Sequence, residues 1–539
     1  MMGAIMSLKG MKPYRIDSSA YHLIKLIMNR LWKLLVAFFL VVEIVSCRDL
    51  RRDTVEDDLS AFGPYESLLD TTLLNACLLR ELDNDTAKWH SDKTVREWYR
   101  EHPVSIWYTS KGISSDADSM LSYLRRELVL NGLDTTAFYI PQITANLNIV
   151  HQLAFDSVNR SINEVLPQLD YLLSKAFVRF VTGQRYGFTR PNKYLNHLDH
   201  KPLSKNPNDF SQLFDYEIKS PEYDEALRAL KSEERIDFLY ASKPNGHVYE
   251  ALCKKMSQTT DVAERTKIAV NMERCRWQIS HPSRDERCII VNIPAQQLWA
   301  FCPDSVVPMR ICCGSTSHKT PLLYSEISYM QVNPEWVIPL NIIKAEVSAH
   351  AGDSAYFARN DYSIVDKESG DTLDVKSVDC EDMESGRLRV VQKCGAHNSL
   401  GRLVFRFQNN FAIYLHDTNN HNAFNRDRRT VSHGCVRVQK PFELACFLLP
   451  DADEWELEQL RISIDIPPVT KRGKEYLKKH SDAPRPHRLI SYHGVSPKIP
   501  LYIIYFTMYP NPENGEIESW NDLYGYDTVI GKEMKSLLR

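Results

Sequence analysis

The segment from Asn410 to Cys435 constrains the fold of this chain more than any other. Its first part, Asn410–Asp417, alternates strongly apolar side chains with other residues, which is typical of a strand with one buried face. Tyr414 and His416 then share the opposite face. A polar loop leads back to the motif Ser-His-Gly-Cys at 432–435. The sequence therefore predicts a strand that carries a histidine and a return that places a cysteine beside it.

This arrangement suits nucleophilic catalysis. A thiol is mostly protonated near neutral pH, and a neighbouring imidazole can convert it into a nucleophilic thiolate. We expect His416 to take the proton of Cys435 and the backbone carbonyl of Asp417 to orient the imidazole. Gly434 has no side chain, so the backbone N–H groups of Gly434 and Cys435 are predicted to face an oxyanion. Such donors are worth roughly 3–4 kcal/mol when well aimed.

Two other interpretations fit the same residues. A single cysteine is often a buried apolar side chain or half of a disulfide, and a single histidine is often structural. The side chains of His416, His421, His433 and Cys435 are also possible metal ligands. The spacing favours nucleophilic catalysis but leaves a metal site and a structural role open.

Beyond these residues, the chain resembles a known family. The pattern His-x15-Ser-His-Gly-Cys-x-Arg, from His416 to Arg437, is similar to the signature of the YkuD-type L,D-transpeptidases, which cross-link peptidoglycan through a cysteine acyl-enzyme. The likeness covers the chain from about Trp98 to the C-terminus and points to the large, multidomain branch of the family. Further matching stretches are Ile289–Ala295, Asn333–Pro339, Asn398–Gly401, Asn425–Asp427 and Asp522–Asp527.

The resemblance implies a reaction and a set of site residues. Cys435 attacks the carbonyl that joins a diamino acid to the terminal D-alanine of a stem tetrapeptide. His416 is the proton donor and acceptor, and His433 shapes the pocket or helps to move protons. The amine of a second stem then completes a 3-3 cross-link. The resemblance implies no cofactor and no metal. It does imply sensitivity to carbapenems, which acylate the same thiol. The residues predicted to bind substrate are Tyr414, Trp336 and Arg437.

The acceptor is not specified by the motif. With water as acceptor the protein is an L,D-carboxypeptidase, and with a D-amino acid it is an exchange enzyme. With a protein as acceptor it attaches that protein to the wall. A catalytically silent wall-binding lipoprotein is a further alternative, which the combined presence of Cys435, His416 and Gly434 disfavours.

The N-terminus is predicted to direct export. Asn29–Lys33 forms a positive region, and Leu34–Val42 forms an apolar region. Ile44-Val45-Ser46-Cys47 resembles a lipobox, in which Cys47 is lipidated. A transmembrane anchor is the alternative, but the uncharged run is too short to span a bilayer and is interrupted by Glu43. We therefore predict a lipoprotein that is membrane-anchored through Cys47 in a bacterial cell envelope and faces the periplasm.

These observations predict an α+β protein in which a mostly α-helical scaffold domain precedes a β-rich, β-sandwich-like catalytic domain. The scaffold rests on apolar stripes of helical period in the N-terminal half, and the catalytic domain on short strands that begin near Cys288. The predicted divisions are a signal peptide at 1–47, with Met28 as an alternative start, a tether at 48–62, the scaffold at 63–285, and the catalytic domain at 286–539 with a capping insertion at about 345–392.

The net charge and the cysteine spacing argue against a nucleic-acid-binding protein and against a disulfide framework. The net charge of -3 over 539 residues is close to neutral and gives no sign of a nucleic-acid binder. Of the twelve cysteines, the ten other than Cys47 and Cys435 are irregularly spaced. They do not indicate a disulfide framework, and we expect most of them to be small buried apolar side chains.

Overall fold

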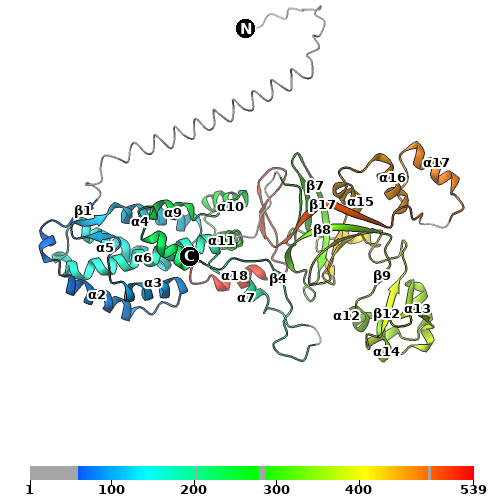
Figure 1. The fold of residues 1–539 in the computed structure, drawn as a ribbon, viewed down its shortest axis with the longest axis horizontal. Coiled ribbons are helices and arrows are strands. Elements are labelled where there is room, and N and C mark those ends of the chain that lie inside the picture. The colour runs from blue at the N-terminus through cyan, green and yellow to red at the C-terminus, as the bar shows by residue number, and fades with distance from the viewer. Residues whose placement is uncertain (1–58, 202–203, 278–285, 484–486, 539) are drawn as a thin grey trace, which may run out of the picture.

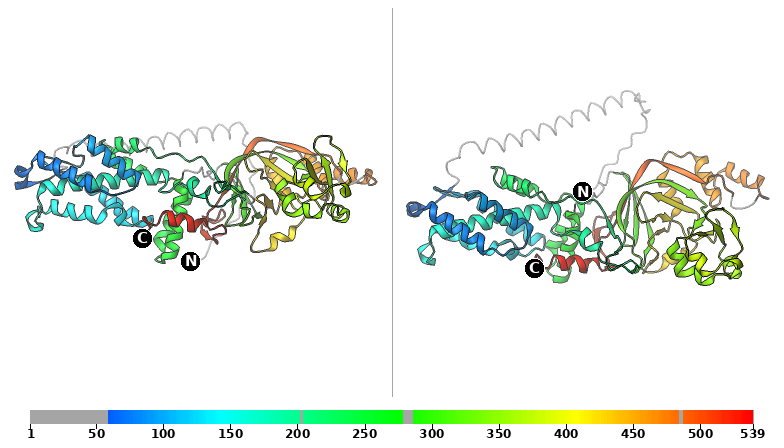
Figure 2. Two further views of the ribbon diagram at one scale, coloured as in Figure 1. Left: turned by 90° about the horizontal axis from the view of Figure 1, so that it is seen from below. Right: turned by 60° about the horizontal axis from the view of Figure 1, so that its bottom comes forward.

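The computed structural model describes residues 59–201, 204–277, 286–483 and 487–538. The molecule is elongated, with helices at one end and a β-rich domain at the other (Figure 1), and the two further views show the same succession (Figure 2). This confirms the predicted α+β architecture. The predicted signal peptide, Cys47 and the tether up to residue 58 lie outside the described residues. Within the described ranges, no helix combines the length and the apolar character needed to cross a membrane.

The helical scaffold is built around α6 (Ile162–Tyr186), which is buried along almost its whole length. Ser161 and Glu164 form a capping box that fixes its start. Helices α2, α3, α5 and α8 pack against it, so this single helix supplies the axis of the domain. The other scaffold helices are α2 (Thr71–Asn84), α3 (His90–Glu101), α4 (Ser115–Leu130), α5 (Ile140–His151), α7 (Pro191–Leu195), α8 (Tyr223–Leu230), α9 (Arg235–Ala241), α10 (His247–Gln258) and α11 (Val262–Arg276), with short 3-10 helices η1 (Gly63–Leu68), η2 (Thr135–Phe138) and η3 (Asp156–Val158).

A small antiparallel sheet closes one end of the scaffold. Strand β1 (Leu59–Ala61) pairs with β3 (Gly112–Ser114), which also pairs with β2 (Tyr108–Thr109). The predicted tether at 48–62 therefore ends in a strand, which corrects that boundary. Strand pairing uses backbone groups, so it does not require the apolar side chains whose scarcity suggested a tether.

The catalytic domain is formed by one ten-stranded mixed sheet that closes on itself. The order is β13-β14-β16-β7-β6-β5-β17-β8-β4, and β13 also pairs with β8, while β15 pairs with β7. The sandwich-like packing thus comes from a closed sheet rather than from two separate ones. Its strands are β4 (Phe214–Asp215), β5 (Cys288–Asn292), β6 (Gln297–Cys302), β7 (Ser305–Gly314), β8 (Leu322–Val332), β13 (Leu403–Phe407), β14 (Leu415–His416), β15 (Thr430–Ser432), β16 (Val436–Val438) and β17 (Tyr492–Ile504).

The remaining elements of this domain lie at the edges of the sheet. The short 3-10 helix η7 (His421–Asn425) lies in the loop between β14 and β15, and a small hairpin follows β17. The helices after β16 lie at the end of the molecule furthest from the scaffold (Figure 1). They are α15 (Pro441–Leu448), α16 (Glu454–Ser463) and α17 (Lys471–Lys479), and the hairpin is β18 (Met508–Pro510) with β19 (Ile517–Ser519).

The capping insertion is a small unit with its own sheet, ordered β11-β10-β12-β9, and its own apolar core. The sequence predicts it at about 345–392, but β9 places its start near Trp336, because the proline-rich Asn333–Pro339 segment contributes an edge strand. Its elements are β9 (Trp336–Val337), α12 (Leu340–Ile342), η4 (Ile343–Val347), η5 (Ser348–His350), α13 (Ser354–Arg359), β10 (Tyr362–Asp366), β11 (Thr372–Leu373), η6 (Val375–Ser377), α14 (Cys380–Glu384) and β12 (Leu388–Gln392).

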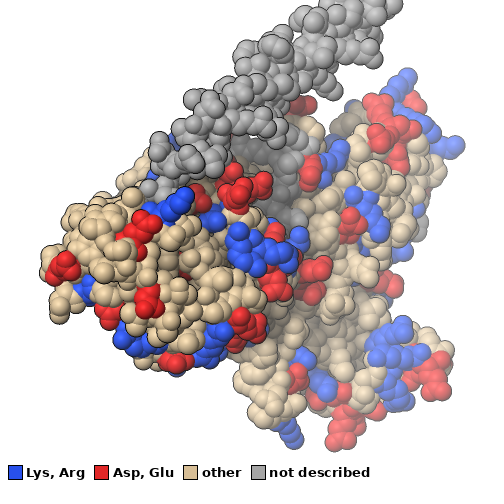
Figure 3. Space-filling model, turned by 60° about the vertical axis from the view of Figure 1, so that its left-hand side comes forward, with Lys and Arg blue, Asp and Glu red and all other residues tan. Residues whose placement is uncertain are grey.

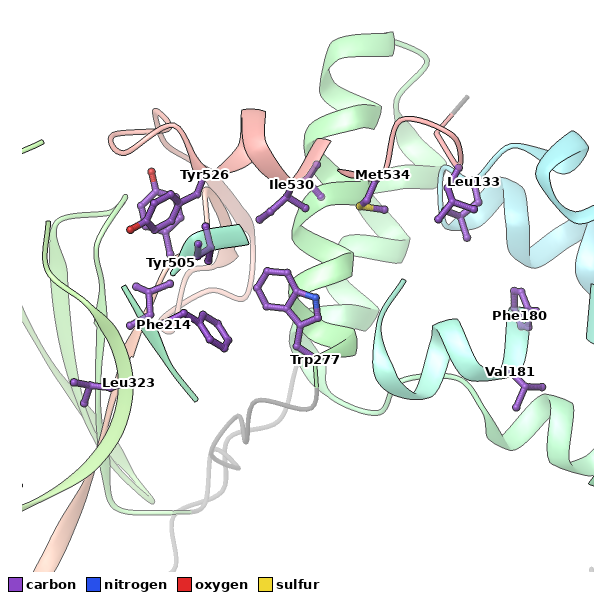
Figure 4. Close-up of a cluster of buried hydrophobic side chains, with 14 of the residues drawn as sticks. Leu133, Phe180, Val181, Phe214, Trp277, Leu323, Tyr505, Tyr526, Ile530 and Met534 are labelled. Carbon is purple, nitrogen blue, oxygen red and sulfur yellow. The ribbon is translucent and has the colours of Figure 1, made fainter. Parts of the chain in front are cut away.

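The two large domains are joined by more than their linker. Strand β4, from the scaffold side of the sequence, pairs with β8 of the catalytic sheet. The last helix, α18 (Tyr526–Glu533), returns to the scaffold, where the backbone N–H of Asp134 donates to the carbonyl of Leu537 at 2.7 Å. Buried side chains from both domains and from α18 form one continuous cluster (Figure 4). The predicted boundary near residue 285 therefore does not separate two units in space.

Charged side chains of both signs are mixed over the face shown in Figure 3. Neither the basic nor the acidic residues form a continuous field on that face, in keeping with the near-neutral net charge of -3.

Candidate active site

The predicted catalytic residues lie on two neighbouring strands of the closed sheet. Strands β14 and β16 are parallel, with His416 opposite Arg437, and the N–H of Val436 donates to the carbonyl of Tyr414 at 3.1 Å. Side chains of paired residues point to the same side of a sheet and alternate along each strand. Tyr414, His416, Cys435 and Arg437 therefore share one face. His416 and Cys435 are diagonal neighbours, with Cα atoms roughly 8 Å apart from strand spacing and rise.

The imidazole of His416 is buried and neutral. The side chain is 5% exposed, and its Nδ1 has no hydrogen-bond partner among the described residues. Burial lowers the pKa of His416 to about 3, and the positive charge of Arg437 acts in the same direction. Hydrogen bonding to the backbone of Asp417 and Leu400 opposes this shift. The ring therefore has an unprotonated, unpartnered nitrogen that can accept a proton.

The thiol of Cys435 is also neutral at rest. Burial raises the pKa of Cys435, while the backbone N–H of Tyr414 and the charges of Arg406 and Arg437 lower it. The sequence suggested a thiolate activated by an imidazole, and burial disfavours the charged form of each group before substrate binds. We therefore expect proton transfer to His416 to accompany the attack of the sulfur.

The turn that presents Cys435 is held by its own serine. The Oγ of Ser432 accepts the N–H of Gly434 at 3.2 Å and donates to the carbonyl of Cys435 at 2.5 Å. This corrects the prediction that the N–H of Gly434 faces an oxyanion, since that group is already bonded within the turn. The N–H of Cys435 makes no hydrogen bond to any described residue and remains the candidate oxyanion donor. Gly434 has φ +115°, which other residues adopt only with strain.

A buried network outside the motif fixes the same turn. The Oγ1 of Thr320 donates to the carbonyl of Gly434 at 2.8 Å and accepts the N–H of Gly314 at 2.9 Å. The hydroxyl of Tyr524 accepts the N–H of Thr320 at 3.2 Å and donates to the carbonyl of Gly314 at 2.7 Å. Tyr524, in the C-terminal segment, thus supports the turn that carries the nucleophile.

A groove of about 680 Å³ runs beside this face and is lined by two predicted residues, Trp336 and Tyr414. Arg406 also lines it, with its guanidinium 4.2 Å from the centre of the Tyr414 ring and its Nε donating to Gln331 at 2.8 Å. In the described part of the chain Arg406 forms no ion pair, so its charge is free to meet a carboxylate. The buried Nε1 of Trp336 has no hydrogen-bond partner there and is a second free donor.

Arg437 does not line this groove. Its register on β16 places it opposite His416 on one side and Cys312 on the other, and its Nε is buried without a hydrogen-bond partner. That Arg437 holds a substrate carboxylate stays a prediction. Its charge disfavours protonation of His416 and favours the thiolate of Cys435, and Arg406 is the arginine of the groove.

His433 points toward the capping insertion. Its Nε2 lies 2.9 Å from Oε1 of Glu346, and its ring centre lies 5.1 Å from that of His318. His421, named above as a possible metal ligand, is instead exposed and lies 3.5 Å from Asp417. The described residues contain no group of three or more histidine, cysteine, aspartate or glutamate side chains placed to hold a metal ion. The eleven described cysteines are free thiols.

The sequence did not identify Arg406, Thr320, Tyr524 or Glu346. Arg406 lies in a strand-like run, but the sequence does not indicate which strand pairs with that run in the sheet. Tyr524 lies in the Asp522–Asp527 stretch, which matched the family without indicating a role. Thr320 and Glu346 carry no sequence signal, because their contacts depend on tertiary placement.

Comparisons with known proteins match two parts of the chain. Residues 286–459 match the family profile of the L,D-transpeptidase catalytic domain, YkuD, and residues 93–256 match that of the Scaffold domain. The chain is 29% identical over 324 residues to a Haemophilus influenzae protein named "Putative L,D-transpeptidase". This alignment covers 58% of the present chain and 60% of that relative.

Proposed function

Because this chain carries the catalytic domain of the YkuD L,D-transpeptidase family together with a Scaffold domain, we propose that it is a peptidoglycan L,D-transpeptidase. In this proposal it joins stem peptides by 3-3 cross-links through an acyl-enzyme on Cys435. The observation that carries the proposal is the shared face of His416 and Cys435, which combines a buried, unpartnered imidazole nitrogen with a half-buried thiol on the neighbouring strand.

Acylation begins with the donor stem in the groove beside Tyr414 and Trp336. The sulfur of Cys435 attacks the carbonyl carbon before the terminal D-alanine, and its proton passes to His416 as the carbon–sulfur bond forms. The oxyanion faces the N–H of Cys435. His416 then gives the proton to the departing amine of D-alanine, which leaves a thioester. Arg406 meets a carboxylate of the donor stem.

The second half of the reaction transfers the acyl group. The side-chain amine of an acceptor stem attacks the thioester carbonyl, the carbon–nitrogen bond forms, and the sulfur leaves. The sulfur takes up a proton through His416, and the enzyme returns to its neutral resting state. Attack by water would give a shortened stem instead of a cross-link.

We further propose that the mature protein is a lipoprotein of the bacterial envelope, anchored through Cys47 and facing the periplasm. The support is the positive region, the apolar region and the lipobox-like Ile44–Cys47 in the sequence. Growth with an alkyne-tagged fatty acid should label the wild-type protein and leave Cys47→Ala unlabelled. Equal labelling of both proteins, or of neither, would contradict the lipid anchor.

Product analysis on defined muropeptides tests the enzymatic proposal. The purified protein should convert a disaccharide tetrapeptide into a 3-3 linked dimer with release of D-alanine, and Cys435→Ala should not. A shortened monomer as the sole product would identify a carboxypeptidase. The absence of any product would support a silent wall-binding protein.

A further inference from the structure

The capping insertion places one carboxylate directly on the catalytic motif. Glu346, in η4, lies 2.9 Å from Nε2 of His433, two residues before the nucleophile. The side chains of Glu346 and His433 are 54% and 35% exposed, so both can be reached by a ligand. No lysine or arginine among the described residues forms an ion pair with Glu346. Its negative charge is therefore matched by His433 alone.

This cluster is separate from the donor groove. Glu346, His433 and His318 are absent from the lining of that groove, which is built from strands β8, β9 and β13 and the segment before β14. The carbonyl oxygens of His318 and Lys319 lie within about 4 Å of the position that a Cβ on Gly434 would occupy. Two carbonyl oxygens and a carboxylate therefore lie near the motif that carries the nucleophile, and oxygen acceptors of this kind suit a cation.

We propose that Glu346 and His433 form the acceptor site, in which the capping insertion supplies the carboxylate that positions His433 as the base for the incoming amine. This inference rests on the proposed transpeptidase function and deepens it. Its ligand class is a primary ammonium on a short aliphatic chain, as in the side chain of a diamino acid. Glu346 acts through His433 and is a positioning residue.

In this proposal each proton of the incoming amine has an acceptor. The carboxylate of Glu346, with Oε1 2.9 Å from Nε2 of His433, favours the tautomer that carries its proton on Nε2, which leaves Nδ1 as the proton acceptor. The acceptor ammonium gives one proton to Nδ1, and the neutral amine attacks the thioester carbonyl. As the carbon–nitrogen bond forms, the carbon–sulfur bond breaks. The nitrogen loses its second proton to the sulfur through His416, and His433 passes the first proton to water.

The charged and titratable neighbours permit this role. His318 faces His433 from the loop before β8, and burial lowers the pKa of His318, which favours its neutral form, while the carboxylate of Glu346 acts in the opposite direction. On the cap, Tyr356 and Tyr362 face Glu346, and burial raises the pKa of each hydroxyl so that both remain uncharged. Glu346 thus carries the negative charge of the cluster.

The experiment measures how the acyl-enzyme divides between amine and water. Full-length wild type, Glu346→Gln and Glu346→Asp are given the donor tetrapeptide with increasing amounts of a diamino-acid acceptor. D-alanine release reports acylation, and the ratio of cross-linked to hydrolysed product reports acceptor use. The matched control is Asp361→Asn, which removes another cap carboxylate that lies 3.4 Å from a histidine, His397, in an exposed pair.

Glu346→Gln should lower the ratio of aminolysis to hydrolysis by about ten-fold or more while lowering acylation far less. Glu346→Asp should recover part of the ratio, and Asp361→Asn should match wild type. Hydroxylamine, which is already neutral near pH 7, should be used equally well by wild type and Glu346→Gln, because it needs no deprotonation.

Equal loss of acylation and aminolysis in Glu346→Gln would show that Glu346 only closes the cap, and would overturn the inference. An unchanged ratio would overturn it as well. If the wild type is not acylated at all, the proposed function itself fails, and the inference fails with it. Acylation with an unaltered ratio refutes the inference alone.

Discussion

Buried ionisable groups are treated in opposite ways in the two domains. In the scaffold, Asp92 is fully buried and accepts hydrogen bonds from Nε of Arg179 at 3.1 Å and from the hydroxyl of Tyr139 at 2.7 Å. In the catalytic domain, His416 is buried and Cys435 is half-buried, neither has a directly bonded counter-charge among the described residues, and burial disfavours the charged form of both. The burial penalty on a charge operates in both places. In the scaffold, hydrogen bonds and ion pairs compensate the penalty. In the active site no ion pair within the described part of the chain compensates it.

This difference between the domains indicates that the scaffold charges serve folding stability and that the catalytic pair serves the reaction. A buried charge that has all its partners keeps its protonation state. Removing one partner leaves an uncompensated charge in the interior. A buried neutral pair can exchange a proton when substrate supplies the compensating interactions. We therefore expect substitutions in the scaffold network to change folding, and substitutions in the catalytic pair to change rate.

The largest expected effect is on catalysis. His416→Gln should lower acylation of Cys435 by roughly 10²–10⁴-fold, because the general base is lost. The free energy of unfolding near neutral pH should change little, since the imidazole is uncharged there. His421→Gln, which alters a nearby exposed histidine, is the control and should acylate normally. A large loss of stability in His416→Gln with normal acylation would reverse the contrast between the domains.

The scaffold network should show the opposite profile. Asp92→Asn leaves the buried side chain of Arg179 without its carboxylate and Lys175 with Asp85 alone, and it should destabilise the protein by about 3–5 kcal/mol in urea unfolding. The acylation rate of the folded fraction should be unchanged. Asp83→Asn, in an exposed pair with Arg100, should have little effect on stability. Similar stabilities for the two variants would show that the buried pair contributes no more to the free energy of unfolding than the exposed pair does.

The pH dependence of stability sharpens the comparison further. Between pH 6.5, an ordinary histidine value, and about pH 3, the unfolded chain binds a proton at His416 that the folded chain does not. The free energy of unfolding should therefore fall as the pH falls through this window, by up to about 1.4 kcal/mol per pH unit for this group. His416→Gln should show a correspondingly shallower decline. Parallel curves for the two proteins would mean that His416 is protonated in the fold.

The smallest of these effects concerns substrate binding. Arg406→Gln should raise the KM for the donor peptide by about ten-fold with a smaller change in kcat, because the groove loses its cation while Arg437 still lowers the pKa of Cys435. Arg389→Gln, at an exposed position on the cap strand β12, should behave as wild type. A fall in kcat with KM unchanged would assign Arg406 to the chemical step instead.

The sequence was sufficient for the catalytic face but not for its surroundings. Alternation along the strand indicated that Tyr414 and His416 share a face, and the motif placed Cys435 opposite them. Arg406 was not found, because its position opposite Tyr414 depends on the register of β13 with β14, in which Val404 pairs with His416. No local pattern carries that register.

The protonation state was beyond the sequence for a similar reason. A histidine and a cysteine in one motif suggest an ion pair, and only their burial shows that both are neutral. Burial here comes from elements far away in the chain, such as the Thr320–Tyr524 network behind the turn. The contact of Glu346 with His433 likewise joins two segments 87 residues apart (433 less 346) and follows from the placement of the cap.

The central claim is that Cys435 carries the acyl group, and intact-mass measurement tests it most directly. After incubation with the donor tetrapeptide or a carbapenem, the wild type and Cys380→Ala, which removes an exposed thiol, should gain the mass of one acyl group. Cys435→Ala should gain none. A wild type that releases D-alanine without an adduct, or an adduct that persists in Cys435→Ala, would contradict the account.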